Sequence, residues 1–124
     1  MSKPIRYVLL GCGTVGSGIL EIVQQSRALL ESRIGAPLEL AKVVVRDPGR
    51  VRNVALPAEL VGTDPLAAVE DPTVDVVVEV MGGLDPAGPA IERALRLGKS
   101  VVTANKSLLA SRGAELLALA AERR

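Results

Sequence analysis

Glycines recur at fixed spacing where the first apolar segment of the chain ends. Residues Gly11 to Gly16 read Gly-Cys-Gly-Thr-Val-Gly; an apolar run over 5–10 precedes them, and apolar positions at helical spacing follow. Between a buried strand and an amphipathic helix, Gly11 would allow a tight turn, Gly13 would admit a phosphate close to the backbone, and Gly16 would let the helix pack on a sheet. The pattern predicts a pyrophosphate site for a dinucleotide, held by unpaired N–H groups at the helix start. The alternative is a turn that needs glycine for its backbone alone.

A basic residue follows the second apolar run. Arg46 stands where a dinucleotide fold contacts the adenosine ribose: an acidic residue there binds the 2′-hydroxyl group, and an arginine accommodates a 2′-phosphate. Asp47 comes next, and Arg50 and Arg52 add positive charge downstream. The arginines favour NADP over NAD as the cofactor. The alternative is that Arg46 and Asp47 are solvated residues of a turn.

The third apolar run ends in Met81 and two glycines, Gly82 and Gly83. A side chain at the glycines would block a group that lies close to the backbone, and a nicotinamide ring or its ribose is the natural candidate. Glu79 lies within the preceding valine-rich run. Because a buried carboxylate must be paired or hydrogen-bonded, we expect Glu79 to hold the glycine turn in place.

Lys106 is the most informative single residue. It follows Asn105, which is suited to cap a helix, so Lys106 would begin that helix. A cation at a helix N-terminus opposes the helix dipole. A lysine is favourable there if an anion or a reacting carbonyl oxygen is held nearby, and the alternative is a lysine that extends into solvent.

Strands and helices alternate along the chain and would place these residues at one edge of a sheet. Strands are predicted over 5–10, 38–45, 74–80 and 100–103, and helices over 15–33, 64–69 and 85–97 and from 105 to 124 with an interruption near Gly113. Asp64 and Asp85, each followed by proline, would cap their helices, and 50–63 is predicted to be irregular. The alternation predicts an α/β fold, a Rossmann-type doubly wound parallel sheet forming a single domain over 1–124.

Composition excludes several classes of protein. Hydrophobic residues make up 48% of the chain but Tyr7 is its single aromatic residue, so the core must be aliphatic, as in a parallel sheet covered by helices. With no histidine and one cysteine, Cys12, we expect neither a metal site nor a disulfide. A net charge of +1 without basic runs argues against nucleic acid. Without a signal peptide or an apolar span of about 20 residues, we expect no membrane association and a cytoplasmic location.

Several segments together resemble those of homoserine dehydrogenase. They read Gly-Cys-Gly-Thr-Val-Gly-Ser-Gly, Val-Val-Val-Arg-Asp, Val-Glu-Val-Met-Gly-Gly and Val-Thr-Ala-Asn-Lys-Ser-Leu-Leu-Ala. They occur in the family's order and cover nearly the whole chain, and the last two are the specific ones. The resemblance implies the NAD(P)-binding domain of an oxidoreductase that interconverts L-aspartate 4-semialdehyde and L-homoserine, on the biosynthetic pathway to threonine, methionine and isoleucine.

The resemblance also implies roles for individual residues. Thr14 and Val15 would contact the pyrophosphate through their backbone, Thr103 would lie on the nicotinamide side, and Lys106 would be catalytic at the reacting end. An ammonium group there would stabilise the negative charge that hydride transfer builds on an aldehyde oxygen. The complete set expected to bind the cofactor is Gly11, Gly13, Thr14, Val15, Gly16, Arg46, Met81, Gly82, Thr103 and Lys106.

The family's second domain has no counterpart in these residues. That domain binds the substrate and carries a second catalytic lysine, acidic residues, a monovalent-cation site and the sheet of a homodimer. We therefore expect a fragment that binds nucleotide without turning over substrate, whereas the parent enzyme acts on a small-molecule substrate as a homodimer.

Two rival interpretations remain open. One is the cofactor domain of another dehydrogenase, such as an aspartate dehydrogenase or a sugar oxidoreductase, although the latter shows Glu-Lys-Pro where this chain has Ala-Asn-Lys. The other is a stand-alone module that senses a nucleotide and controls a partner.

Overall fold

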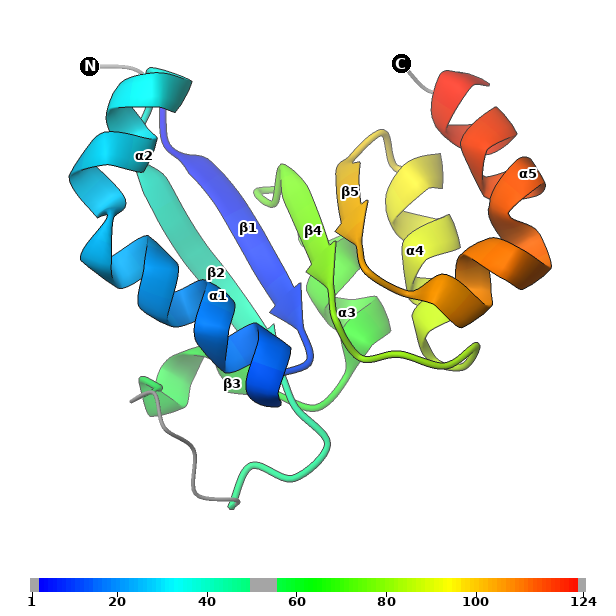
Figure 1. Ribbon diagram of the computed structural model, residues 1–124, viewed down its shortest axis with the longest axis horizontal. Helices are drawn as coiled ribbons and strands as arrows, with labels where there is room; N and C mark the ends of the chain where they lie inside the picture. Colours follow the sequence, from blue (N-terminus) through cyan, green and yellow to red (C-terminus); the bar gives the residue numbers. More distant parts are fainter. Residues whose placement is uncertain (1–2, 50–55, 123–124) are drawn as a thin grey trace.

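A five-stranded parallel sheet lies at the centre of the fold, with helices on both faces (Figure 1). The computed structural model describes residues 3–49 and 56–122, and the order of its strands is β3-β2-β1-β4-β5. The strands are β1 (Ile5–Leu10), β2 (Leu38–Val44), β3 (Val61–Gly62), β4 (Val76–Glu79) and β5 (Ser100–Thr103). The helices are α1 (Thr14–Gln25), α2 (Arg27–Ile34), the short 3₁₀ helix η1 (Ala58–Leu60), α3 (Pro65–Glu70), α4 (Ala87–Arg96) and α5 (Lys106–Glu122).

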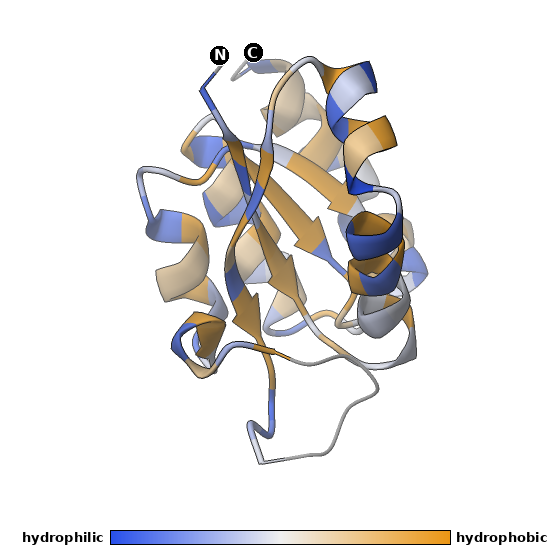
Figure 2. Cartoon of the chain, turned by 90° about the vertical axis from the view of Figure 1, so that its left-hand side faces the viewer, coloured by the Kyte–Doolittle hydropathy of each residue, from blue (hydrophilic) through white to orange (hydrophobic). Residues whose placement is uncertain are grey.

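The two faces of the sheet are covered by different helices. Leu9 and Val43 pack against Leu20 of α1 on one face, and Val8 and Val77 belong to the cluster that includes Ala90 of α4 on the other. Successive strand residues point to opposite faces, which is why neighbouring residues of β1 enter different clusters. Figure 2 shows the strands mostly in the hydrophobic colours, between helices that carry both hydrophobic and hydrophilic residues. The predicted doubly wound α/β fold is confirmed.

The strand β3 lies in a segment that we expected to be irregular. Val61 and Gly62 pair in parallel with Val43 and Val44 of β2, so this part of the prediction is wrong. A strand of two residues is too short to show a period in the sequence. The 3₁₀ helix η1 lies in the same segment, and residues 50–55 lie outside the described residues.

The long first helix of the prediction is divided at Ser26 into α1 and α2. The reason is tertiary: Arg27 donates to the Leu38 carbonyl at 2.7 Å, and the Leu38 N–H donates to the Glu31 carboxylate at 2.6 Å. These bonds tie α2 to the beginning of β2. Gly35, at a φ of +81°, ends α2 as the sequence indicated.

The start of α4 also differs from the prediction. We expected Asp85 to cap this helix, but the helix begins at Ala87 with Pro86 in the capping position and without a side-chain cap. The Gly88 N–H donates to the Leu84 carbonyl at 2.8 Å, so the backbone satisfies the first turn. The cap of α3 is confirmed, because Asp64 accepts from two backbone N–H groups of its first turn at 3.0 and 3.3 Å.

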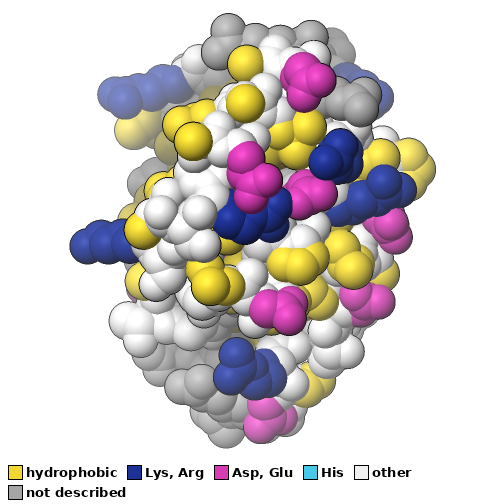
Figure 3. All heavy atoms as spheres, turned by 90° about the vertical axis from the view of Figure 1, so that its right-hand side faces the viewer, with side chains coloured by type: hydrophobic (Ala, Val, Ile, Leu, Met, Phe, Trp, Pro, Cys, Tyr) yellow, Lys and Arg dark blue, Asp and Glu magenta, His cyan; other side chains and the backbone are white. Residues whose placement is uncertain are grey.

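The last helix runs through Gly113 without the interruption that we expected. An interior glycine costs about 1 kcal/mol, and packing against α4 outweighs it: Leu108 and Leu116 are buried in a cluster with α4. Arg112 adds ion pairs to Glu92 of α4 and to Glu115, and Figure 3 shows charged side chains of both signs across this face. Hydrogen bonds from Arg112 and Arg96 lower the pKa of the Glu92 carboxyl.

Candidate functional site

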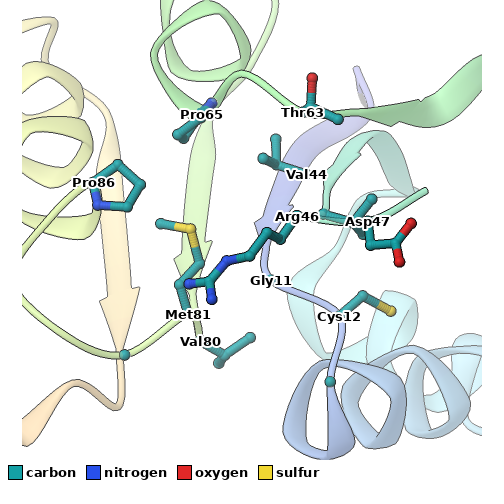
Figure 4. A pocket seen from close by; sticks show the side chains of 13 residues that line it. Gly11, Cys12, Val44, Arg46, Asp47, Thr63, Pro65, Val80, Met81 and Pro86 are labelled. Atoms are coloured by element: carbon teal, nitrogen blue, oxygen red, sulfur yellow. The ribbon is translucent and has the colours of Figure 1, made fainter. Parts of the chain in front are cut away.

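A pocket of about 510 Å³ lies beyond the carboxyl ends of β1, β2 and β4 (Figure 4). We expected the carboxyl ends of all four predicted strands to meet at this edge of the sheet. The pocket brings three of them together, the glycine loop, Arg46-Asp47 and Met81-Gly82, whereas Thr103 and Lys106 do not line it. Its lining is completed by Cys12, Val44, Val45, Thr63, Pro65, Val80 and Pro86.

Two glycines of the loop are required by the fold itself. Gly11 adopts a φ of +100°, and a Cβ atom there would lie 3.1 Å from backbone atoms of Val80 and Met81. A Cβ atom at Gly16 would lie 2.5 Å from the Gly11 carbonyl oxygen, too close for any side chain. The close packing predicted for Gly16 is therefore present, against the Gly11 backbone just after β1, and it explains both glycines without a ligand.

Gly13 is different, because no contact within the described residues excludes a side chain there. Its φ is −84°, and a Cβ atom there would meet no atom within 4 Å. Gly13 caps α1 without a side-chain hydrogen bond, so the N–H groups of Thr14 and Val15 in the first turn receive no acceptor from the cap. Both residues are exposed beside the pocket. This combination leaves room and unpaired donors for an anion.

Arg46 and Asp47 take different directions at the end of β2. In Figure 4 the Arg46 side chain extends across the pocket toward the side of Met81, whereas the Asp47 carboxylate points the other way. An Asp47 carboxylate oxygen accepts from the Gly49 N–H at 3.0 Å, which is the local turn that Asp-Pro-Gly favours. The guanidinium group is therefore the charged group offered to a ligand here. Arg50 and Arg52 lie outside the described residues.

Glu79 holds the turn after β4, as we expected. Its side chain is completely buried, and one carboxylate oxygen accepts from the Met81 N–H at 2.8 Å and the Gly82 N–H at 3.0 Å. Gly82 and Gly83 adopt φ values of +78° and +74°, which favour glycine. The turn presents Met81 and Gly82 to the pocket.

The segment after β5 adjoins this turn. The Asn105 side-chain oxygen accepts from the Leu108 N–H at 3.0 Å, which confirms Asn105 as the cap of α5. Lys106 is the first residue of that helix and is exposed. The Thr103 hydroxyl donates to Glu79 at 2.5 Å, and the Asn105 amide donates to the Gly83 carbonyl at 2.6 Å. Lys106 therefore lies on a helix that is bonded to the pocket-lining turn.

Some lining residues were not anticipated from the sequence. Thr63 and Pro65 follow β3, so they would have been expected at this edge only if that strand had been recognised. Pro86 reaches the pocket because α4 begins one residue after it. Cys12 is buried, with its sulfur 3.7 Å from the Ser17 hydroxyl oxygen.

The parallel sheet, the glycine loop between β1 and α1, and the pocket beyond the strand ends together define a Rossmann-type dinucleotide-binding domain. Residues 11–124 match the family model described as homoserine dehydrogenase, NAD binding domain. The chain belongs to this family, which confirms the resemblance that its motifs indicated.

Individual relatives agree with the family match. The chain is 47% identical over 120 residues to the homoserine dehydrogenase of Bacillus subtilis (strain 168), covering 97% of this chain and 28% of the relative. A crystal structure of the S. aureus homoserine dehydrogenase at pH 7.0 has a TM-score of 0.91 at 33% identity, over 99% of this chain and 31% of that one. A hyperthermophilic archaeal homoserine dehydrogenase in complex with NADPH has a TM-score of 0.73 at 25% identity, over 98% of this chain and 42% of that one.

The chain therefore spans less than a third of the length of the Bacillus relative. Within its described residues, no helix is both long and apolar enough to cross a membrane.

Proposed function

We propose that this chain binds NADP(H) and is the cofactor-binding part of an enzyme that interconverts L-aspartate 4-semialdehyde and L-homoserine. The observation that supports it most is the unfilled space at Gly13, which opens into a pocket beside the first turn of α1. Membership of the homoserine dehydrogenase family supports the reaction, and the archaeal relative solved with NADPH supports the cofactor. The part of the relatives that this chain does not cover would bind the substrate, so we expect nucleotide binding by these residues without turnover.

The arrangement of the pocket suggests the direction in which the dinucleotide lies. The pyrophosphate would lie over Gly13 and accept from the N–H groups of Thr14 and Val15, at the positive end of α1. The adenosine half would extend toward the end of β2, where the Arg46 side chain begins, and the nicotinamide half toward Met81 and the other pocket-lining residues after β4. The Arg46 guanidinium lies on the Met81 side in Figure 4, so it would turn back toward the end of β2 to meet a 2′-phosphate. Gly11 and Gly16 would act indirectly, by allowing the close turn that presents these donors.

The reacting end would involve the segment after β5. The cofactor supplies or accepts the hydride, and the Lys106 ammonium group would stabilise the negative charge that develops on the carbonyl oxygen of the substrate. Lys106 is exposed at the start of α5, which leaves it accessible to a substrate bound outside this domain. Thr103 and Gly82 would set the position of this segment relative to the nicotinamide.

The preference for NADP rests on the division of roles between Arg46 and Asp47. A 2′-phosphate needs a cation, and the Arg46 guanidinium extends into the pocket (Figure 4). A free 2′-hydroxyl would instead need an acidic acceptor. The Asp47 carboxylate is hydrogen-bonded within its own turn, so it is poorly placed for that function.

Calorimetric titration with NADPH and with NADH tests the proposal on three proteins: the unmodified chain, Arg46→Gln and Arg33→Gln. Arg33 lies on α2, and its substitution is the control because it removes the same charge away from the pocket. Loss of a charge-assisted contact to the 2′-phosphate should weaken NADPH binding about 10- to 100-fold. Arg33→Gln should leave NADPH binding unchanged, and neither variant should alter NADH binding. If the unmodified chain binds NADH as tightly as NADPH, the assignment of Arg46 is wrong; if it binds neither, the proposed function is wrong.

A further inference from the structure

A buried carboxylate connects the segments that follow β4 and β5. Glu79 is completely buried, and its two carboxylate oxygens have different partners. One oxygen accepts from the N–H groups of Met81 and Gly82 at 2.8 and 3.0 Å, and the other accepts from the Thr103 hydroxyl at 2.5 Å. A single side chain therefore bonds the pocket-lining turn after β4 to the strand that leads to Lys106.

A second connection closes the network. The Thr103 hydroxyl oxygen accepts from the Asn105 N–H at 3.0 Å while its proton is donated to Glu79. The Asn105 side chain donates to the Gly83 carbonyl at 2.6 Å and accepts from the Leu108 N–H at 3.0 Å. Asn105 is itself only 4% exposed. The start of α5 is thus joined to the glycine turn by two routes, both of which pass through Asn105.

The network is complementary to a carboxylate. The Met81 and Gly82 amides and the Thr103 hydroxyl all donate, and both oxygens of residue 79 accept. Glutamine would offer one acceptor and would force the Thr103 hydroxyl to become an acceptor. Burying a charge without an ion pair is unfavourable, and the ion pairs recorded among the described residues do not include Glu79.

We propose that Glu79 is a positioning residue: through its bonds to Met81, Gly82 and Thr103 it fixes the turn that would contact the nicotinamide relative to the helix that carries Lys106. This inference deepens the proposed function and rests on it. Glu79 is buried beneath the turn and would not touch the cofactor. Its effect would therefore be confined to the nicotinamide half of the dinucleotide and would not reach the phosphate end at Gly13.

Two ligands separate positioning from a general loss of structure. NADPH carries the nicotinamide, and 2′-phospho-ADP-ribose is the same molecule without it. Glu79→Gln and Thr103→Val should each weaken NADPH binding about three- to tenfold, the effect of one misplaced hydrogen bond, and should leave the binding of 2′-phospho-ADP-ribose unchanged. Thr103→Ser, which keeps the hydroxyl, should restore NADPH affinity.

A matched control is available at Thr73. Its hydroxyl donates to the Asp71 carboxylate at 2.7 Å, away from the pocket lining, so Thr73→Val removes a similar bond at an unrelated place. Thr73→Val should change neither affinity. Amide hydrogen exchange gives a second readout: Thr103→Val should speed exchange at the Met81 and Gly82 N–H groups about tenfold, because Glu79 then loses its anchor on β5.

The outcomes discriminate between the two proposals. Equal weakening of both ligands, or unchanged NADPH affinity in Glu79→Gln and Thr103→Val, would overturn the positioning role of Glu79. If the unmodified chain binds neither ligand, the proposed function fails, and the exchange rates at Met81 and Gly82 still decide whether the network exists. If Glu79→Gln does not fold, Thr103→Val with its Ser counterpart decides the affinity test.

Discussion

Replacing Gly13 with alanine tests whether the space in front of α1 is kept for a phosphate. A Cβ atom at Gly13 would meet no atom of the described residues within 4 Å, whereas at Gly16 it would lie 2.5 Å from a backbone oxygen. An alanine methyl group at position 13 would therefore meet no steric clash. Gly18, in the interior of the same helix, offers a matched control, because a Cβ atom there also meets nothing within 4 Å.

The effect on stability should be small for Gly13→Ala. Alanine is a poorer helix cap than glycine by up to about 1 kcal/mol, and the reduced freedom of the unfolded chain offsets about 0.4–1 kcal/mol of that loss. The free energy of unfolding should therefore change by less than about 1 kcal/mol. Gly18→Ala should raise it by up to about 1 kcal/mol, since alanine replaces glycine inside a helix.

The effect on binding should be large for Gly13→Ala alone. A hydrogen bond from a backbone N–H to a charged phosphate contributes about 1.5–3 kcal/mol. A methyl group at Gly13 would hold the pyrophosphate away from the N–H groups of Thr14 and Val15, at the cost of about one such bond. That cost corresponds to a roughly 10- to 100-fold weaker affinity for NADPH.

Calorimetric titration with NADPH, together with urea unfolding followed by circular dichroism, measures both quantities on the same three proteins. The expected result is a folded Gly13→Ala variant that binds weakly beside a Gly18→Ala variant that binds normally. Unchanged NADPH affinity in Gly13→Ala would show that no phosphate lies against this residue. Equal weakening in Gly18→Ala would show that the loss comes from the helix and not from the site.

Two further predictions follow from the charges and burial of single side chains. Lys106→Ala removes a cation from a helix N-terminus, so the free energy of unfolding of this chain should stay level or rise by a few tenths of a kcal/mol. Turnover by a longer polypeptide that contains the domain should fall about 100- to 1,000-fold. Unchanged turnover would show that Lys106 is a solvated surface residue. Burial raises the pKa of the Tyr7 hydroxyl, and the nearby Arg27 charge partly opposes this shift. The neutral phenol therefore stabilises the fold below about pH 10, and this contribution to the free energy of unfolding is lost as the pH rises further. Tyrosinate absorbance, which reports on this residue alone, should change together with the circular dichroism, and tyrosinate formation in a chain that keeps its ellipticity would contradict this.

Local chemistry explains why much of the fold was predictable. The glycine loop, the Asp64 and Asn105 caps and the terminal glycine at Gly35 each act within a few residues, and the structure shows all of them. The strand β1 was also predicted with its observed bounds, because a continuous apolar run ending at glycine has few other interpretations. Features whose causes lie nearby in the chain are visible in a single sequence.

The errors have causes that lie elsewhere in the chain. The division between α1 and α2 accompanies the hydrogen bonds that Arg27 and Glu31 make with the Leu38 backbone. These residues become neighbours of Leu38 only after β2 has formed. The continuity of α5 through Gly113 depends on α4, whose Glu92 pairs with Arg112. Neither contact can be recognised from spacing along one helix.

The same division holds for the candidate site. Arg46 and Met81 were placed at one edge because the carboxyl ends of parallel strands converge, and they line one pocket. Thr63 lines it too, but its strand β3 is too short to recognise. The bond between Asn105 and Gly83 joins segments 22 residues apart, and no local pattern indicates it.

The two ends of the pocket are built by different physical means, and they should respond differently to substitution. The proposed phosphate end presents backbone N–H groups from Thr14 and Val15, whose side chains are exposed, so recognition there would depend on the path of the backbone and on the missing side chain at Gly13. The proposed nicotinamide end would depend on the identities of Glu79 and Thr103, because their side chains bond to the turn and to each other. Conservative changes should therefore be tolerated at Thr14 and Val15, whereas even an isosteric change at Glu79 should be felt by the reacting half of the cofactor.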